Sequence, residues 1–159
     1  MNILVVYFSH SGNTREIAGQ IQAITGGDIL EIQSQKPYPK DYDAVVEQAR
    51  IELDSGYIPV LKAKIKNIEK YETVIIGYPN WWATIPAPVK TFLSEYDFSG
   101  KSIAPFCTHE GSGLGRSVTD ISKLCAGTKM LEGLEIRGSG VKNAQSKVSE
   151  WLRKIKLTK

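Results

Sequence analysis

The sequence predicts a single α/β domain built on one doubly wound, five-stranded parallel sheet of order 2-1-3-4-5, with helices on both faces. Three observations predict this fold. Short and almost wholly apolar runs alternate with amphipathic stretches along the chain. The 159 residues fit one domain. No internal repeat, low-complexity tract or long linker divides them, so residues 1–159 are treated as one domain.

The strands are expected where short apolar runs occur. The predicted strands span residues 3–8, 28–32, 74–78, 102–107 and 130–136. The first run is apolar along nearly its whole length, as is typical of a central parallel strand that is covered on both faces. Pro79 ends the third strand, because proline has no N–H to donate to a ladder. Gly133 is expected to interrupt the fifth strand.

The helices are expected in the amphipathic stretches between these strands. They are predicted at residues 14–24, 41–54, 86–95 and 114–124, and near the C-terminus. Gly26 and Gly27 end the first helix, because glycine commonly follows the last helical turn. The second helix carries Val45, Ala49 and Leu53 as its apolar residues. The C-terminal helix is basic, and its apolar residues recur at helical spacing: Val141, Val148, Trp151, Leu152 and Ile155.

The composition is that of an ordinary globular protein, with 42% hydrophobic and 23% charged residues. The net charge of +3 is unevenly spread: residues 1–80 hold 8 Lys/Arg against 10 Asp/Glu, whereas residues 81–159 hold 12 against 7. Nucleic-acid binding is one interpretation of the basic C-terminal stretch. Its helical apolar spacing favours instead a solvated helix docked on the core, so we expect no nucleic-acid partner.

Other features bear on the compartment. No run approaches the ~20 apolar residues that a membrane helix needs, so we expect no membrane partner. The chain begins directly in strand-like sequence, and no signal peptide is visible. Cys107 and Cys125 form no C-x-x-C pair and are expected to be buried free thiols in a reducing cytoplasm.

The predicted topology indicates where a ligand binds. In such a sheet the ligand site lies at the carboxyl ends of the strands, at the point where the strand order reverses. Here that point lies between the first and third strands, with the loop after the fourth strand nearby. These three loops, at residues 9–14, 79–85 and 108–115, are also the most unusual stretches of the chain.

The first loop has the composition of an anion site. It consists of Ser9, His10, Ser11, Gly12, Asn13 and Thr14, directly before a predicted helix. Hydroxyl groups and free N–H groups at a helix N-terminus favour a phosphate, and Ser11 and Thr14 are expected to face solvent. The alternative is an ordinary capped turn, because Ser, Asn and Thr also favour helix starts. The loop matches neither of the glycine-rich patterns for nucleoside triphosphates and dinucleotides.

The second loop offers flat aromatic faces. Its residues at the ligand edge are Pro79, Asn80, Trp81, Trp82, Ala83 and Thr84. Two adjacent tryptophans cannot both face inward on a regular strand, so at least one is expected to stack on a fused aromatic ring. The sequence does not decide which of the two stacks. The alternative is that both pack on the flanking helix.

The third loop is rich in glycine. Its residues are Thr108, His109, Glu110, Gly111, Ser112 and Gly113, followed by a predicted helix. Glycines here favour a backbone close to the ligand, with N–H groups that donate to its carbonyl oxygens. The alternative is a flexible loop without a ligand. A metal site at His10 and His109 is rejected because no further ligands have suitable spacing.

Taken together, these residues resemble the flavodoxin family over almost the whole chain. The strongest element is residues 7–14, which look like the family's phosphate loop; residues 78–82 with Pro86, and residues 108–113, resemble a short bacterial branch. The resemblance implies one FMN, with its phosphate at residues 9–14 and its ring between the second and third loops. It also implies an electron carrier between redox partner proteins, without catalytic side chains. The branch often has glycine where Ala83 stands.

Two other functions were weighed against the electron carrier. An NAD(P)H-dependent FMN oxidoreductase acting on quinones or nitro compounds is the alternative, although no second nucleotide motif is present. A phosphate-accepting signalling domain is rejected, because that class needs acidic residues where Asn2 and Asn80 stand.

The charge pattern leads to an expectation about the redox partner. Four basic residues flank the second and third loops in sequence: Lys90, Lys101, Arg116 and Lys123. If they surround the flavin edge, they favour an acidic partner. The alternative is that they lie scattered on solvated helix faces. Many flavodoxins are acidic, whereas this chain has a pI of about 8.8.

Overall fold

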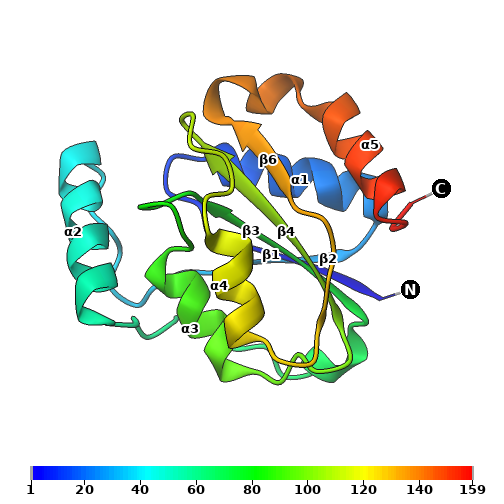
Figure 1. The fold of residues 1–159 in the computed structure, drawn as a ribbon, viewed down its shortest axis with the longest axis horizontal. Helices are drawn as coiled ribbons and strands as arrows, with labels where there is room; N and C mark the ends of the chain where they lie inside the picture. The colour runs from blue at the N-terminus through cyan, green and yellow to red at the C-terminus, as the bar shows by residue number, and fades with distance from the viewer. Residues whose placement is uncertain (1, 159) are drawn as a thin grey trace.

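A computed structural model describes residues 2–158, and its core is one parallel sheet (Figure 1). The strands are β1 (Ile3–Tyr7), β2 (Asp28–Glu31), β3 (Thr73–Pro79), β4 (Ser102–His109), β5 (Lys129–Met130) and β6 (Leu134–Arg137). Their order is β2-β1-β3-β4-β5, which confirms the predicted order, and β6 also pairs with β4. The fifth predicted strand is divided around Gly133 into β5 and β6, as expected.

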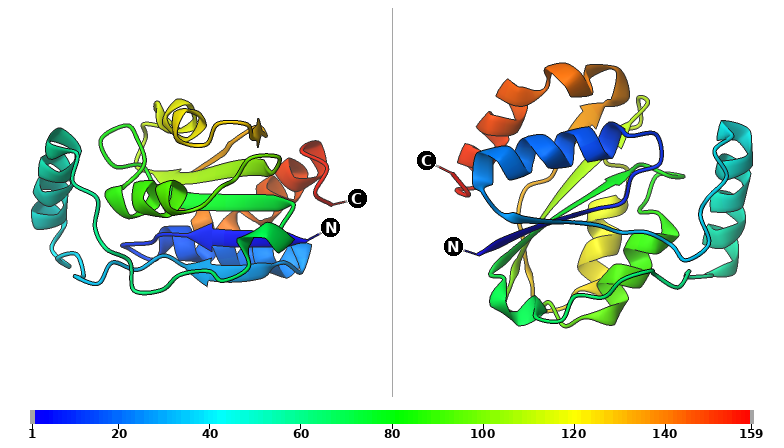
Figure 2. Two further views of the ribbon diagram at one scale, coloured as in Figure 1. Left: turned by 90° about the horizontal axis from the view of Figure 1, so that it is seen from below. Right: turned by 180° about the vertical axis from the view of Figure 1, so that it is seen from behind.

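Four helices cover the two faces of the sheet (Figure 2). These four are α1 (Asn13–Thr25), α3 (Ala87–Glu95), α4 (Ser117–Leu124) and α5 (Gln145–Lys154). The structure also contains helix α2 (Tyr42–Ser55) and short 3-10 turns at Ile68–Lys70 and Gly138–Asn143. Helices α1 and α5 pack on one face, whereas α3 and α4 pack on the other. The C-terminal basic stretch therefore docks its apolar side on the core, as Val148, Trp151 and Leu152 are all buried.

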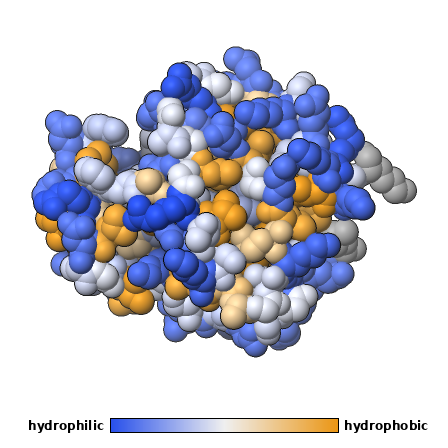
Figure 3. Space-filling view, in the orientation of Figure 1, coloured by the Kyte–Doolittle hydropathy of each residue, from blue (hydrophilic) through white to orange (hydrophobic). Residues whose placement is uncertain are grey.

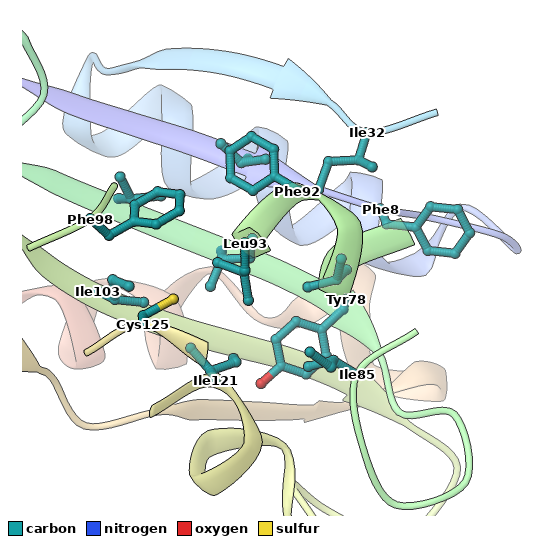
Figure 4. Close-up of a cluster of buried hydrophobic side chains, with 14 of the residues drawn as sticks. Phe8, Ile32, Tyr78, Ile85, Phe92, Leu93, Phe98, Ile103, Ile121 and Cys125 are labelled. Carbon is teal, nitrogen blue, oxygen red and sulfur yellow. The ribbon is translucent and has the colours of Figure 1, made fainter. Parts of the chain in front are cut away.

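The apolar strands are buried on both sides, because successive side chains point to opposite faces. Val5 lies in the cluster with α1 and α5, whereas Val6 lies in the cluster with α3 and α4. Figure 4 shows this second cluster, with Tyr78 among its labelled side chains. The buried hydroxyl of Tyr78 donates a hydrogen bond to Ser117 Oγ at 2.8 Å. The buried side chain of Tyr78 holds the end of β3 in place, and this fixes where the loop after β3 begins.

Helix α2 departs from the expected arrangement, because it does not lie flat on the sheet. It stands beside the carboxyl ends of the strands (Figure 1) and forms a lobe with a notch between it and the main body (Figure 3). Leu61, Ile65 and Tyr71 from the connection after α2 pack on the cluster that a flat helix would cover. Val45 of α2 is buried, whereas Leu53 is 41% exposed.

Both cysteines are buried free thiols, as expected. Burial raises the pKa of the Cys125 thiol to about 11, and burial together with the charge of Glu135 raises that of Cys107 to about 12. No helix within residues 2–158 is long and apolar enough to cross a membrane.

Candidate functional site

A cavity of about 730 Å³ opens where the loops after β1, β3 and β4 meet helix α2. Twelve of the residues predicted from sequence line it: His10, Ser11, Asn13, Pro79, Asn80, Trp81, Trp82, Ala83, Thr108, His109, Glu110 and Ser112. Six other predicted residues lie in the same loops without lining it: Ser9, Gly12, Thr14, Thr84, Gly111 and Gly113. The topology thus brings all three predicted loops to one place.

The first loop presents unpaired backbone donors at the start of α1. The Ser9 hydroxyl accepts the N–H groups of Gly12 at 3.2 Å and Arg15 at 3.3 Å, which holds the turn. Gly12 has a φ of 100°, a conformation that favours glycine. Within residues 2–158, no acceptor lies within hydrogen-bond distance of the N–H groups of Asn13 and Thr14. These are the orphan donors of a helix N-terminus, and they suit an anion.

The side chain of Thr14 does not face solvent, and the expectation that it would is wrong. Thr14 is 1% exposed, and its hydroxyl lies 2.8 Å from the Thr108 hydroxyl. The first turn of α1 packs against the sheet, so this side chain joins the first loop to the third. Ser11 is exposed, as expected. Arg15 forms an ion pair with Glu31 and does not line the cavity.

The second loop closes in a tight reverse turn without glycine. Trp81 and Thr84 exchange backbone hydrogen bonds of 3.2 Å each. Trp82 and Ala83, between them, have φ values of 57° and 66°. Positive φ at both central residues defines a type I′ turn, which normally uses asparagine and glycine. Asn80 holds this turn, because its side chain accepts the Ala83 N–H at 2.8 Å and donates to the Gly113 carbonyl at 2.7 Å.

The two tryptophans have different surroundings. The ring centroid of Trp81 lies 5.3 Å from that of Phe8 and 5.2 Å from that of Tyr38, in edge-on packing. Trp82 is 46% exposed, and its Nε1–H donates to the Val46 carbonyl of α2 at 2.9 Å. Both line the cavity, but only Trp82 donates a hydrogen bond to the flanking helix.

We expect Ala83→Gly to raise the free energy of unfolding by about 0.5–1 kcal/mol. A left-handed conformation costs an L-residue roughly 1–2 kcal/mol, whereas glycine loses only about 0.5–1 kcal/mol more backbone freedom than alanine. Urea unfolding measures the difference. Ala126→Gly is the matched control, because Ala126 is exposed and has no positive φ. It should lower stability; an equal loss in both variants would show that the turn is not strained.

The third loop also contains backbone N–H groups without an acceptor among the described residues. Gly111 has a φ of 135°, and its N–H donates to Nδ1 of His109 at 2.9 Å. This N–H is therefore occupied within the loop and not free for a ligand. In the described chain, the N–H groups of Glu110, Ser112 and Gly113 have no acceptor within hydrogen-bond distance. Two neighbouring loops thus present unpaired donors.

Helix α2 supplies a fourth wall that was not predicted from the sequence. Tyr42, Val45, Val46 and Ala49 line the cavity opposite the loops. A signal was present in the sequence, because α2 carries apolar residues on more than one side, including the exposed Ile51. A helix that packs on a sheet by one face has no need of these additional apolar residues.

Two of the four basic residues that flank the loops in sequence make contacts of their own. Lys101 is 9% exposed at the start of β4, and its Nζ donates to the Tyr71 carbonyl at 2.6 Å. It lies at the opposite end of the sheet from the cavity, so this residue fits the alternative of charges scattered away from the site. Arg116 forms an ion pair with Asp120 at 3.3 Å, which offsets its charge.

Comparisons with known proteins place these observations in context. A family model described as Flavodoxin matches residues 2–155. A Bacteroides eggerthii protein provisionally named a flavoprotein shares 31% identity over 98% of both chains, with a TM-score of 0.86. A similarly named Bacteroides uniformis protein shares 28% identity over 96% of this chain and 97% of that one, with a TM-score of 0.85. A Lactobacillus acidophilus flavoprotein solved with FMN shares 22% identity over 94% of this chain and 97% of that one, with a TM-score of 0.73. No curated protein matches.

Proposed function

Because this chain belongs to the flavodoxin family, we propose that it binds one FMN in the cavity and carries electrons between redox partner proteins. One observation carries the proposal: two neighbouring loops present unpaired N–H groups beside a cavity with aromatic walls. The two unbridged cysteines support a reducing cytoplasm as its compartment.

The first loop fits the phosphate group. The N–H groups of Asn13 and Thr14 at the start of α1, with the exposed hydroxyl of Ser11, offer donors to a phosphomonoester. The dipole of α1 adds partial positive charge there. Arg15, the basic residue that follows the loop in sequence, pairs with Glu31. Neutral donors would therefore hold the phosphate.

The rest of the cavity fits a fused ring. Trp81 and Trp82 give it aromatic walls, and Val45 and Ala49 of α2 give it an apolar one. The N–H groups of the third loop would donate to the polar edge of the ring. When bound, FMN supplies the chemistry, which is the uptake and release of electrons. The chain binds it, orients it and limits the access of water.

We expect FMN to bind at least about 100-fold more tightly than riboflavin, which lacks the phosphate. Hydrogen bonds to a charged group are each worth about 1.5–3 kcal/mol, so two lost bonds account for such a factor. Titration of the purified chain with each ligand, followed by flavin fluorescence, measures both affinities. Equal affinities would remove the phosphate site at residues 9–14. No binding of either ligand would overturn the proposed function.

The α2 wall favours a second candidate function. It extends the cavity beyond the three loops, and 730 Å³ lies well within the ~300–1,000 Å³ of small-molecule sites. A planar quinone or nitro compound beside the flavin would make the chain an NAD(P)H-dependent oxidoreductase. Loss of the visible absorbance of the flavin on adding NAD(P)H, with no other protein present, would favour the oxidoreductase. Reduction only by a partner protein would favour the carrier.

A further inference from the structure

His109 is held in a specific and demanding environment. Its side chain is 7% exposed at the end of β4, and its ring lines the cavity. Nδ1 accepts the N–H of Gly111 at 2.9 Å. An imidazole nitrogen that accepts a hydrogen bond carries no proton, so the neutral ring must bear its proton on Nε2. This hydrogen bond closes the third loop upon itself, in the manner of an Asx turn.

The other ring nitrogen is buried without a hydrogen-bond partner among the described residues. Glu135 Oε2 of β6 lies 3.6 Å from Nε2, which is beyond hydrogen-bond distance. Arg137 of β6 lies on the same side, with its guanidinium 3.5 Å from the Glu110 carbonyl. Glu110 is the charged residue of the loop itself.

A proton on Nδ1 conflicts with the loop. It would convert the acceptor of the Gly111 N–H into a second donor, so the two N–H groups would face each other. The loop would then have to open. The N–H groups of Glu110, Ser112 and Gly113 would lose the arrangement that they have beside the cavity.

We propose that His109 is a positioning residue: by accepting the Gly111 N–H, its Nδ1 holds the third loop in the form that binds FMN. This inference rests on the proposed FMN site and assigns the shape of its third loop to one hydrogen bond. Loss of the acceptor would leave the Gly111 N–H without its partner and let the loop open. FMN affinity would then fall, whereas another side chain with an acceptor at the same place would preserve it.

The matched test uses His109→Asn and His109→Leu. The Asn side-chain oxygen can accept the Gly111 N–H two residues on, as Nδ1 does. Leu removes the acceptor. The FMN dissociation constant is measured for all three chains at one pH. Urea unfolding of each variant shows whether the fold is kept.

We expect His109→Leu to bind FMN on the order of tenfold more weakly than the wild type, and His109→Asn to stay within a few-fold of it, because asparagine restores the acceptor. In the FMN-free chain, nitrogen NMR should find the proton of the neutral His109 ring on Nε2. At one pH, hydrogen exchange of the Gly111 amide should be faster in His109→Leu than in the other two chains. Equal affinities of His109→Leu and the wild type, or a neutral ring with its proton on Nδ1, would overturn the inference while leaving the FMN site intact. Failure of the wild type to bind FMN would instead overturn the proposed function, and this inference with it.

Discussion

Replacing Ser11 by aspartate is expected to weaken FMN binding on the order of 100- to 1,000-fold. Ser11 is exposed, lines the cavity and lies in the loop that presents the α1 donors. A phosphomonoester carries a charge of about −1.5 to −2 at pH 7. A carboxylate at about 4 Å from it costs on the order of 4 kcal/mol at the dielectric constant of a protein surface. No basic residue of the loop would offset that repulsion, because Arg15 is paired with Glu31.

Ser11→Asn is the matched control, since asparagine has the shape of aspartate without its charge. It should bind FMN within a few-fold of the wild type. Riboflavin binding, measured by the same fluorescence titration, should be nearly equal in all three chains. Salt should partly restore FMN binding to Ser11→Asp. If Ser11→Asp and Ser11→Asn weaken FMN equally, the phosphate lies elsewhere and only the shape of the loop matters.

The fold could be predicted because local patterns and topology rules agree. The run of residues 3–8 is apolar at consecutive positions, and such a run fits a strand with helices on both sides. Val5 and Val6 indeed face opposite clusters. The position of α2 could not be predicted in this way. It depends on Leu61 and Tyr71, distant in sequence, which cover the face where a flat helix would lie.

The site was predictable in its loops but not in its contacts. The rule that ligands bind at the carboxyl ends of strands brings residues 9–14, 79–85 and 108–115 together. The rule does not indicate that Thr14 is buried against Thr108, because that contact joins residues 94 positions apart. The type I′ turn at Trp82 and Ala83 was also hidden, since neither residue is a usual one for positive φ.

Replacing Gly77 by alanine is expected to lower the free energy of unfolding by about 3 kcal/mol, the upper end for added bulk in a packed core. Gly77 pairs with Phe106 in the β3–β4 ladder, and the Phe106 ring lies across it. An added Cβ would lie 1.9 Å from Cζ of that ring, far inside contact distance. The ring is fully buried and cannot turn away into solvent. Strand β3 leads directly into the second loop, so FMN binding should weaken in parallel as the folded fraction falls.

Two further variants test the cause of this loss. Gly19→Ala serves as the control, because Gly19 is exposed on α1 and an added Cβ would meet nothing within 4 Å. It should raise stability by about 0.5–1 kcal/mol, as alanine favours a helix. Phe106→Leu trims the ring and creates a cavity of its own. The double variant should nevertheless lose less stability than the sum of the two single losses, because the alanine methyl group then occupies part of the vacated space. Strict additivity in urea unfolding would mean that the Phe106 ring is not what excludes a side chain at position 77.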